Sequence, residues 1–329
     1  MVPSNPLRAA AGMVFALLCA TAAAQSYPSK PVTLIVPYGT GGTADISARG
    51  FAAIAQKYLG QPIVVQNRPG ASGIIGSKHV HDSSNDGYTL LAARISSQVA
   101  LPALEPRMVP YPWDAFTIVG LLEFNPFTCI VSARSPYKTL QDLLSAIKAR
   151  PGKLNVAVAG AADASVVMPV LALRSYGLPA DAATQIQYKG GGDMLIAVLG
   201  GHVDFSCNSI PSFMSALSSG DARALVVTSE SRLPELPLAP TPAEVAMPSL
   251  RTVNAWGALY GPPSLPQNVL DKWSEVLAKV AADPEWLRQL RGRAAVQGIG
   301  TMSLAEERRF IAAQYEEYRA LAPLLTTNK

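Results

Sequence analysis

The residues best suited to chemistry form a glycine-rich stretch near the start of the chain, PYGTGGTAD at residues 37–45. An apolar run at residues 32–36 precedes it, and a helical pattern at residues 46–58 follows it. The stretch therefore predicts a turn between a strand and a helix N-terminus, with Thr43 as the helix cap. Backbone N–H groups and the helix dipole at such a turn favour an anion, although the glycines could also serve the turn geometry alone. The stretch matches neither the dinucleotide-binding fingerprint nor a P-loop.

Catalytic groups are harder to assemble from this sequence. A hydrolase with the Gly-x-Ser-x-Gly motif combines a nucleophile with a histidine and an acid, and the motif is missing. The three histidines, His79, His81 and His202, fall outside the loops expected to face a ligand. No His, Cys and Asp cluster has the spacing of a metal site. We therefore expect no metal, no cofactor and no enzyme activity.

Residues 1–24 have the layout of a secretory signal peptide. Arg8 precedes an apolar core at residues 11–20, and three alanines at residues 22–24 make a small-residue cleavage site. The core is too short to span a membrane, and a buried N-terminal helix is the alternative interpretation. Cys19 follows a leucine instead of a small residue, which favours a cleaved product over a lipid-anchored one. We expect export to the periplasm with cleavage near Ala24.

The composition limits the partners. The formal net charge of +4 falls by one when Arg8 leaves with the signal peptide, and no block of basic residues occurs. Nucleic-acid binding is therefore not expected. Cys129 and Cys207 are the two cysteines that follow the signal peptide. An oxidising compartment permits a disulfide between them, but two buried thiols fit the sequence equally well.

Strands alternate with helices along the remaining chain, which predicts an α/β fold of mostly parallel sheets flanked by helices. We expect two lobes. Residues 25–126 together with residues 253–329 would form the first lobe, and residues 127–252 would form the second. The chain would cross between the lobes near Asn125 and near Asn254.

Ligand-facing loops are expected to follow the strands, because ligands bind at the carboxyl ends of strands in open α/β sheets. In the first lobe such a loop covers residues 94–98, and in the second lobe the loops cover residues 159–163, 189–193 and 207–211. Residues 117–122 and 128–132 are expected to be two separate strands.

Several short motifs along the mature chain share their order and spacing with a known family. They are Tyr27-Pro28-Ser29-Lys30-Pro31, Pro37-Tyr38 with Gly41-Gly42 and Asp45, Gln61-Pro62, Asn67-Arg68-Pro69-Gly70, Asp86-Gly87-Tyr88-Thr89-Leu90, Pro151-Gly152-Lys153-Leu154, Tyr188-Lys189-Gly190, Gly201-His202-Val203-Asp204 and Arg223-Ala224-Leu225. Each motif is short, but together they cover essentially the whole mature chain. The sequence therefore resembles the substrate-binding proteins of tripartite tricarboxylate transporters, the Bug or TctC-like family.

The resemblance implies a type II-like periplasmic binding protein fold with a ligand cleft between two lobes. It implies binding of small carboxylates through backbone N–H groups and bridging waters, with no catalytic step and no cofactor. The ligand-binding residues carried over by position are Tyr38, Gly39, Thr40, Gly41, Gly42, Thr43, Ser96, Ser97, Asp163, Ser165, Tyr188, Gly190, Gly191, Asn208 and Ser209.

Three positions depart from the family's pattern. Asp163 lies in a loop that is commonly rich in hydroxyl groups, and a desolvated carboxylate would repel a bound carboxylate. Either Asp163 caps a helix, or the ligand presents a cationic or donor group there. Asp193 replaces a proline and is expected to cap a helix. Asn208 replaces an acid and can both donate and accept hydrogen bonds without repelling an anion.

The partners expected from the resemblance are a small organic acid or amino acid and the integral membrane subunits of a transporter. A sensor receptor in the membrane is the alternative partner, because both functions use the same cleft. We expect a monomer whose second lobe rotates about the two crossings to enclose the ligand.

Overall fold

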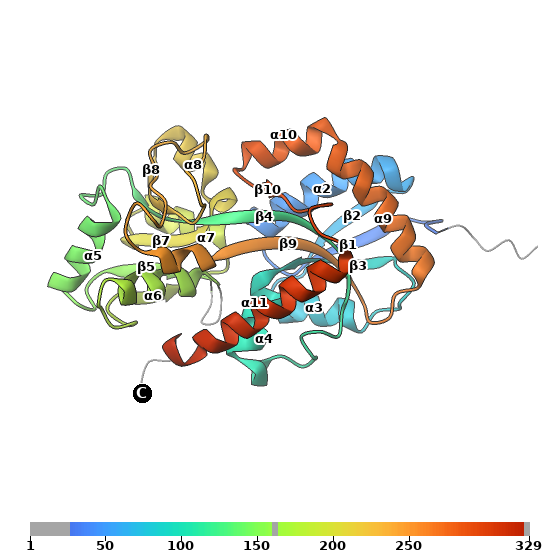
Figure 1. Cartoon of the computed structure of the whole chain (residues 1–329), viewed down its shortest axis with the longest axis horizontal. Coiled ribbons are helices and arrows are strands. Elements are labelled where there is room, and N and C mark those ends of the chain that lie inside the picture. The colour runs from blue at the N-terminus through green and yellow to red at the C-terminus, as the bar shows by residue number, and fades with distance from the viewer. Residues whose placement is uncertain (1–26, 160–163, 326–329) are drawn as a thin grey trace, which may run out of the picture.

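The computed structural model describes residues 27–159 and 164–325 of the 329-residue chain. They form two groups of helices and strands that lie side by side along the long axis of the molecule (Figure 1). Two long strands, β4 (Thr117–Ser132) and β9 (Asn254–Gly261), run between the groups. We call the group with the N-terminal strands the first lobe and the other group the second lobe. The two-lobed α/β fold predicted from the sequence is confirmed.

The first lobe is built around β1, which lies between two parallel neighbours, β2 and β3. β9 extends this sheet in the antiparallel direction, and β10 pairs with the edge of β4. The elements of this lobe are β1 (Val32–Val36), α2 (Thr43–Leu59), β2 (Ile63–Asn67), η1 (Ala71–Gly73), α3 (Ile74–His81), β3 (Thr89–Arg94), η2 (Ser96–Ala100), α4 (Leu101–Leu104), η3 (Pro106–Met108), α9 (Gln267–Ala282), α10 (Pro284–Gly292), β10 (Val296–Gln297) and α11 (Leu304–Leu325).

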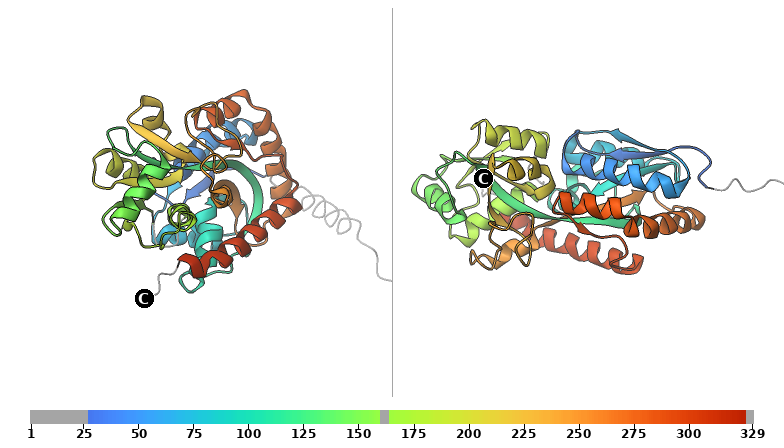
Figure 2. Two further views of the ribbon diagram at one scale, coloured as in Figure 1. Left: turned by 60° about the vertical axis from the view of Figure 1, so that its left-hand side comes forward. Right: turned by 90° about the horizontal axis from the view of Figure 1, so that it is seen from above.

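Alternate residues of β1 pack against different helices, which explains why the strand is a continuous apolar run. Leu34 belongs to a core that includes residues of α2, α9 and α10. Its neighbour Ile35 belongs to a core that includes residues of α3, α4 and α11. Helices therefore cover both faces of the first-lobe sheet, as the views in Figure 2 show.

The second lobe repeats this plan with β5 at its centre, parallel to β6 and β7. β4 joins this sheet in the antiparallel direction between β7 and β8. Parallel pairing therefore holds among β1, β2 and β3 and among β5, β6 and β7, whereas the two long crossing strands pair in the antiparallel direction. The elements of this lobe are α5 (Leu140–Ala149), β5 (Asn155–Val158), α6 (Ala164–Ser175), β6 (Thr184–Gln187), α7 (Gly191–Leu199), β7 (Phe205–Ser209), η4 (Ile210–Ser212), α8 (Met214–Ser219), β8 (Ala222–Val227) and η5 (Pro248–Thr252).

The expectation of two short strands around Asn125-Pro126 is wrong, because β4 is one continuous strand. Pro126 is opposite Asn254 of β9, and the next residue, Phe127, is opposite Ser209 of β7. The extended backbone suits proline, so the strand passes through it and changes partners there. The lobe limits at residues 126/127 and 252/253 stay a prediction.

Aromatic packing fixes α2 against the first-lobe scaffold. The Phe51 ring lies 6.3 Å from the Trp273 ring of α9 and 6.1 Å from the Trp286 ring of α10, measured between centroids. All three side chains are fully buried. Removing them would create large cavities, so this cluster holds α2 at a fixed position and orients its N-terminus.

Candidate functional site

A cavity of about 100 Å³ lies between the two lobes. Residues of the β1–α2 turn and the end of β3 line it from the first lobe, and residues of the β6–α7 turn and the end of β7 line it from the second. The crossing strands contribute one residue each. The lining residues are Tyr38, Gly39, Thr40, Gly42, Thr43, Ala44, Arg94, Ile95, Ser96, Phe127, Ala159, Lys189, Gly190, Gly191, Gly192, Asp193, Asn208, Ser209, Ser212 and Ala255.

The first-lobe wall is the turn between β1 and α2 that the glycine-rich stretch predicted. Gly42 is the N-cap of α2, with φ −82° and ψ 169°, and no side chain caps the helix. The prediction that Thr43 is the cap is therefore wrong. Thr43 is the first helical residue, and its hydroxyl contacts the second lobe instead. The N-terminus of α2, with its positive dipole end, borders the cavity.

Asp45, in the first turn of α2, stabilises the β1–α2 turn through hydrogen bonds of its carboxylate. Its Oδ2 accepts the Gly41 N–H at 3.0 Å, and its Oδ1 accepts from Arg49 and from Asn67 at 2.9 Å each. Burial raises the pKa of Asp45, but these three partners outweigh it, so the pKa lies below its usual value. The Gly41 N–H, which was predicted to face a ligand, is thus bound by a carboxylate of the protein itself.

The second-lobe wall includes the N-terminus of α7. Gly190 is the N-cap of this nine-residue helix, again without a side-chain cap. The prediction that Asp193 caps the helix is therefore wrong, because its carboxylate makes no capping bond and lines the cavity. The exposed Lys189 also lines the cavity and precedes the three glycines at residues 190–192 in the sequence, whereas Asp193 follows them. The cavity therefore lies between two helix N-termini, one from each lobe.

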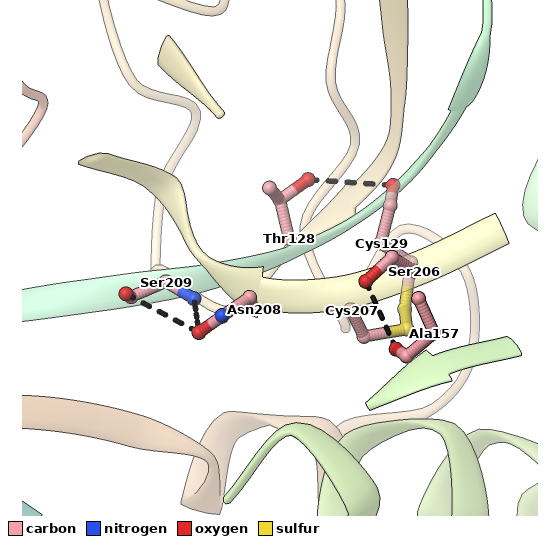
Figure 3. Close-up of a disulfide and its surroundings, with 7 residues drawn as sticks. All are labelled: Thr128, Cys129, Ala157, Ser206, Cys207, Asn208 and Ser209. Carbon is pink, nitrogen blue, oxygen red and sulfur yellow. Dashed lines mark hydrogen bonds between the residues drawn. A yellow bond between two sulfur atoms is a disulfide. The ribbon is translucent and has the colours of Figure 1, made fainter. Parts of the chain in front are cut away.

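A disulfide supports the other part of this wall. Cys129 of β4 and Cys207 of β7 face each other in the antiparallel pair and are bonded, which answers the question that the sequence left open. Asn208 and Ser209 follow Cys207 directly on β7 (Figure 3). The predicted loop at residues 207–211 is therefore wrong at its start, since β7 continues to Ser209. The cross-link fixes the strand that carries these two lining residues.

Most of the predicted binding residues border the cavity. Tyr38, Gly39, Thr40, Gly42, Thr43, Ser96, Gly190, Gly191, Asn208 and Ser209 line it. Their role as ligand contacts stays a prediction. Asp163 lies outside the described residues.

Four predicted residues lie outside the lining. Gly41 binds Asp45, as described above. The buried Ser97 hydroxyl donates to the Arg94 carbonyl at 3.3 Å, and the Ser165 hydroxyl accepts the Ala159 N–H at 2.9 Å. Tyr188 is partly buried and packs against a hydrophobic cluster of the second lobe.

Arg94 lines the cavity and falls in the ligand-facing loop expected at residues 94–98, but it was not among the predicted binding residues. It is the last residue of β3 and only 6% exposed. Its Nη1 donates to Glu123 Oε1 at 3.2 Å, while Arg293 Nη2 donates to Glu123 Oε2 at 3.1 Å. Asn125 donates to Oε1 as well, at 3.1 Å. The signal was present in the sequence, since a charged residue at the carboxyl end of an otherwise apolar strand is expensive unless it is paired or functional.

The cluster of Arg94, Glu123 and Arg293 carries one net positive charge. Burial raises the pKa of Glu123, but Arg293 and Arg94, together with hydrogen bonds from Ser47 and Asn125, lower it below its usual value. Burial lowers the pKa of Arg94, and Glu123 opposes this effect. A guanidinium stays protonated in proteins, so two cations face one carboxylate. The excess positive charge reaches the cavity through Arg94.

Among the residues that the structure describes, no group of three or more His, Cys, Asp or Glu side chains could hold a metal ion. None of the helices in the same residues is both long enough and apolar enough to cross a membrane.

The fold and the cavity between its lobes define a periplasmic binding protein. The family model described as "Tripartite tricarboxylate transporter family receptor", TctC, matches residues 47–322. The chain belongs to this family, which confirms the resemblance found in the sequence.

Individual relatives agree with this assignment. The chain is 33% identical to BugT of Bordetella pertussis over 247 residues, which are 74% of each chain. Its structure is similar to that of MatC from Rhodopseudomonas palustris with bound malate, with 27% identity, a TM-score of 0.83 and coverage of 90% of this chain and 100% of that one. It is also similar to an R. palustris protein with adipate, with 27% identity, a TM-score of 0.84 and coverage of 91% and 98%.

Proposed function

We propose that this protein captures a small carboxylate in the interlobe cavity and delivers it to the membrane subunits of a tripartite tricarboxylate-type transporter. The observation that carries the proposal is the cavity between two uncapped helix N-termini with Arg94 in its wall. Helix N-termini and a guanidinium are the groups that proteins use most often to hold a carboxylate.

The charge of the lining supports an anionic ligand. Among the residues that the structure describes, Arg94 and Lys189 are positive and Asp193 is negative, so their side chains in the lining sum to one positive charge. The α2 and α7 dipoles add positive potential at the same place. Asp193 would repel a second carboxylate placed beside it. A small organic acid with one end near Arg94 is therefore our first candidate, and an amino acid whose ammonium group lies near Asp193 is the second.

The ligands of the relatives guide the choice of probes. MatC is solved with malate and the second R. palustris protein with adipate, so these two proteins of similar structure each hold a small dicarboxylate. We propose the same chemical class for this chain. Binding in this cavity would need no catalytic group, and we propose that the protein is not an enzyme.

Location and partners complete the proposal. We propose that residues 1–24 direct export and are removed near Ala24, and that the mature protein acts in the periplasm as a monomer. Presentation of the bound ligand to a membrane sensor is the second candidate function. Deletion of the gene separates the two: loss of uptake of a labelled acid supports transport, whereas normal uptake with a lost transcriptional response supports sensing.

Calorimetric titration of the mature protein tests the binding step. The probes are malate, adipate and aspartate, and Arg94→Gln is the variant. A hydrogen bond to a charged group contributes about 1.5–3 kcal/mol, so Arg94→Gln is expected to weaken binding of the best probe by about 10- to 150-fold. Arg232→Gln is the control, because Arg232 is a half-exposed surface partner of Glu244. No binding of any probe contradicts the proposed ligand class, and equal affinities of wild type and Arg94→Gln contradict the role of Arg94.

A further inference from the structure

Three hydroxyl groups connect the lobes beside the cavity. The Oγ1 atom of Thr43, the first residue of α2, lies 2.8 Å from Ser209 Oγ and 2.5 Å from Ser212 Oγ. Thr43 belongs to the first lobe, and the two serines, more than 160 positions away in sequence, belong to the second. All three residues are buried, with 7%, 3% and 7% of their surface exposed.

The hydrogen atoms of these groups can be arranged in one direction. Each hydroxyl has one proton to donate. Ser212 can donate to Thr43, Thr43 to Ser209, and Ser209 to Asn208 Oδ1 at 3.4 Å. Asn208 Oδ1 also accepts the Ser209 N–H at 2.7 Å, which fixes the position of this last acceptor in the series of hydrogen bonds. The two hydrogen bonds of the Thr43 hydroxyl therefore exist only while the two lobes are in contact, whereas Ser209 keeps its acceptor Asn208 within the second lobe.

The backbone beside the hydroxyls is shaped for close approach. A Cβ added to Gly191 would overlap the Ser212 side chain, so glycine leaves the room that Ser212 needs. A Cβ on the next residue, Gly192, would meet the Gly41 carbonyl of the other lobe at 3.9 Å. The two helix N-termini thus approach each other across the cleft, and the hydroxyl chain lies at their meeting point.

We propose that Ser212, Thr43 and Ser209 form a latch that holds the lobes closed, and that Ser212 is a positioning residue for the site. Opening about the crossing strands β4 and β9 would separate Thr43 from both serines and break both hydrogen bonds. The closed state then exists before a ligand arrives. Ligand affinity depends on the population of this closed state. This part of the inference rests on the proposed function.

The expected effect follows from two buried hydrogen bonds between neutral groups. Their loss lowers the ratio of closed to open molecules by about tenfold. Thr43→Val removes the hydroxyl and keeps the shape of the side chain, whereas Thr43→Ser keeps the hydroxyl. Ser206→Ala is the matched control, because the fully buried Ser206 hydroxyl donates to the Ala157 carbonyl within the second lobe at 3.0 Å.

The experiment measures the lobe separation in the ligand-free protein. Fluorescent labels are placed through Gln56→Cys on α2 and Ile196→Cys on α7, both exposed positions. Single-molecule energy transfer is expected to show a closed majority in wild type, Thr43→Ser and Ser206→Ala, and an open majority in Thr43→Val. Ser212→Ala removes only the hydrogen bond between Thr43 and Ser212 and is expected to give a smaller shift towards the open state, which keeps the test valid if Thr43→Val fails to fold.

Two outcomes overturn the latch. One is an open majority in the ligand-free wild type, and the other is an unchanged distance distribution in both Thr43→Val and Ser212→Ala. Titration with malate then tests the coupling to affinity, which is expected to fall in Thr43→Val and to recover in Thr43→Ser. Absence of malate binding by the wild type would count against the proposed ligand and not against the latch, because the distances are measured without ligand.

Discussion

Replacement of Glu123 by glutamine is expected to destabilise the protein severely. Glu123 is fully buried and lies 3.2 Å from Arg94 and 3.1 Å from Arg293. The side chains of these arginines are themselves only 7% and 11% exposed. Glu123→Gln keeps the size of the side chain but leaves two buried cations without a counter-charge.

The size of the effect follows from these distances. At about 3 Å and an effective dielectric constant of about 20, each ion pair has a Coulomb energy of about 5 kcal/mol. Much of this energy offsets the cost of desolvating the charges. Breaking a buried pair by removing one partner costs about 3–5 kcal/mol, and we expect the free energy of unfolding to fall by this amount.

The pH dependence gives the effect a second signature. The pKa of Glu123 lies below its usual value of 4.5 in the folded protein. Its stabilisation is therefore fully present above pH 4.5 and is lost as the pH falls through the lower folded pKa. The difference in stability between wild type and Glu123→Gln is expected to shrink in the same acidic range.

Urea unfolding followed by tryptophan fluorescence measures the effect. Glu316→Gln is the control, because Glu316 pairs with Arg319 on the surface and is expected to contribute less than about 1 kcal/mol. The double variant Glu123→Gln with Arg293→Met is expected to recover part of the lost free energy of unfolding, because it leaves one buried cation without a counter-charge instead of two. A loss for Glu123→Gln no larger than that of the surface control would refute the reasoning.

Three further predictions concern the walls of the cavity. Cys129→Ala with Cys207→Ala opens a loop of 78 residues and is expected to lower the free energy of unfolding by about 4 kcal/mol, and equal urea midpoints under oxidising conditions would contradict this. Asp45→Asn is expected to remove the stability that the wild type loses as the pH falls below 3.8. Melting temperatures of wild type and Asp45→Asn that fall by the same amount over this acidic range would argue against it. Gly191→Ala is expected to weaken ligand binding by about tenfold through overlap at the cleft, whereas Gly192→Ala, whose nearest neighbour is 3.9 Å away, is expected to have little effect; similar titrations of the two variants would dismiss the overlap.

Local signals in the sequence predicted the scaffold well. The apolar run at residues 32–36 is β1, and the helical pattern at residues 46–58 lies within α2. These features depend on neighbours in sequence. The continuity of β4 through Pro126 could not be predicted in this way, because it depends on pairing with strands more than 70 residues away along the chain.

The same limit applies to the site. The glycine turn was recognisable because all its residues are contiguous. The sequence placed Arg94 at the end of an apolar strand but could not show its pairing, because Glu123 and Arg293 are distant in sequence and are brought together only by the fold. Ser212 was missed because a lone serine after a strand carries no signal until Thr43 is opposite it.

The glycine turn therefore has a more divided role than its sequence suggests. One of its N–H groups, that of Gly41, binds the Asp45 carboxylate, whose charge is offset by Arg49. A protein that uses its own anion to fix the turn does not need a ligand to form it. The positive potential left for a ligand comes from the N-termini of α2 and α7 and from Arg94. The α2 terminus and Arg94 belong to the first lobe, and the α7 terminus belongs to the second. In the proposed function, ligand capture thus depends on the lobes being closed, and the proposed hydroxyl latch lies at Thr43, where the lobes meet.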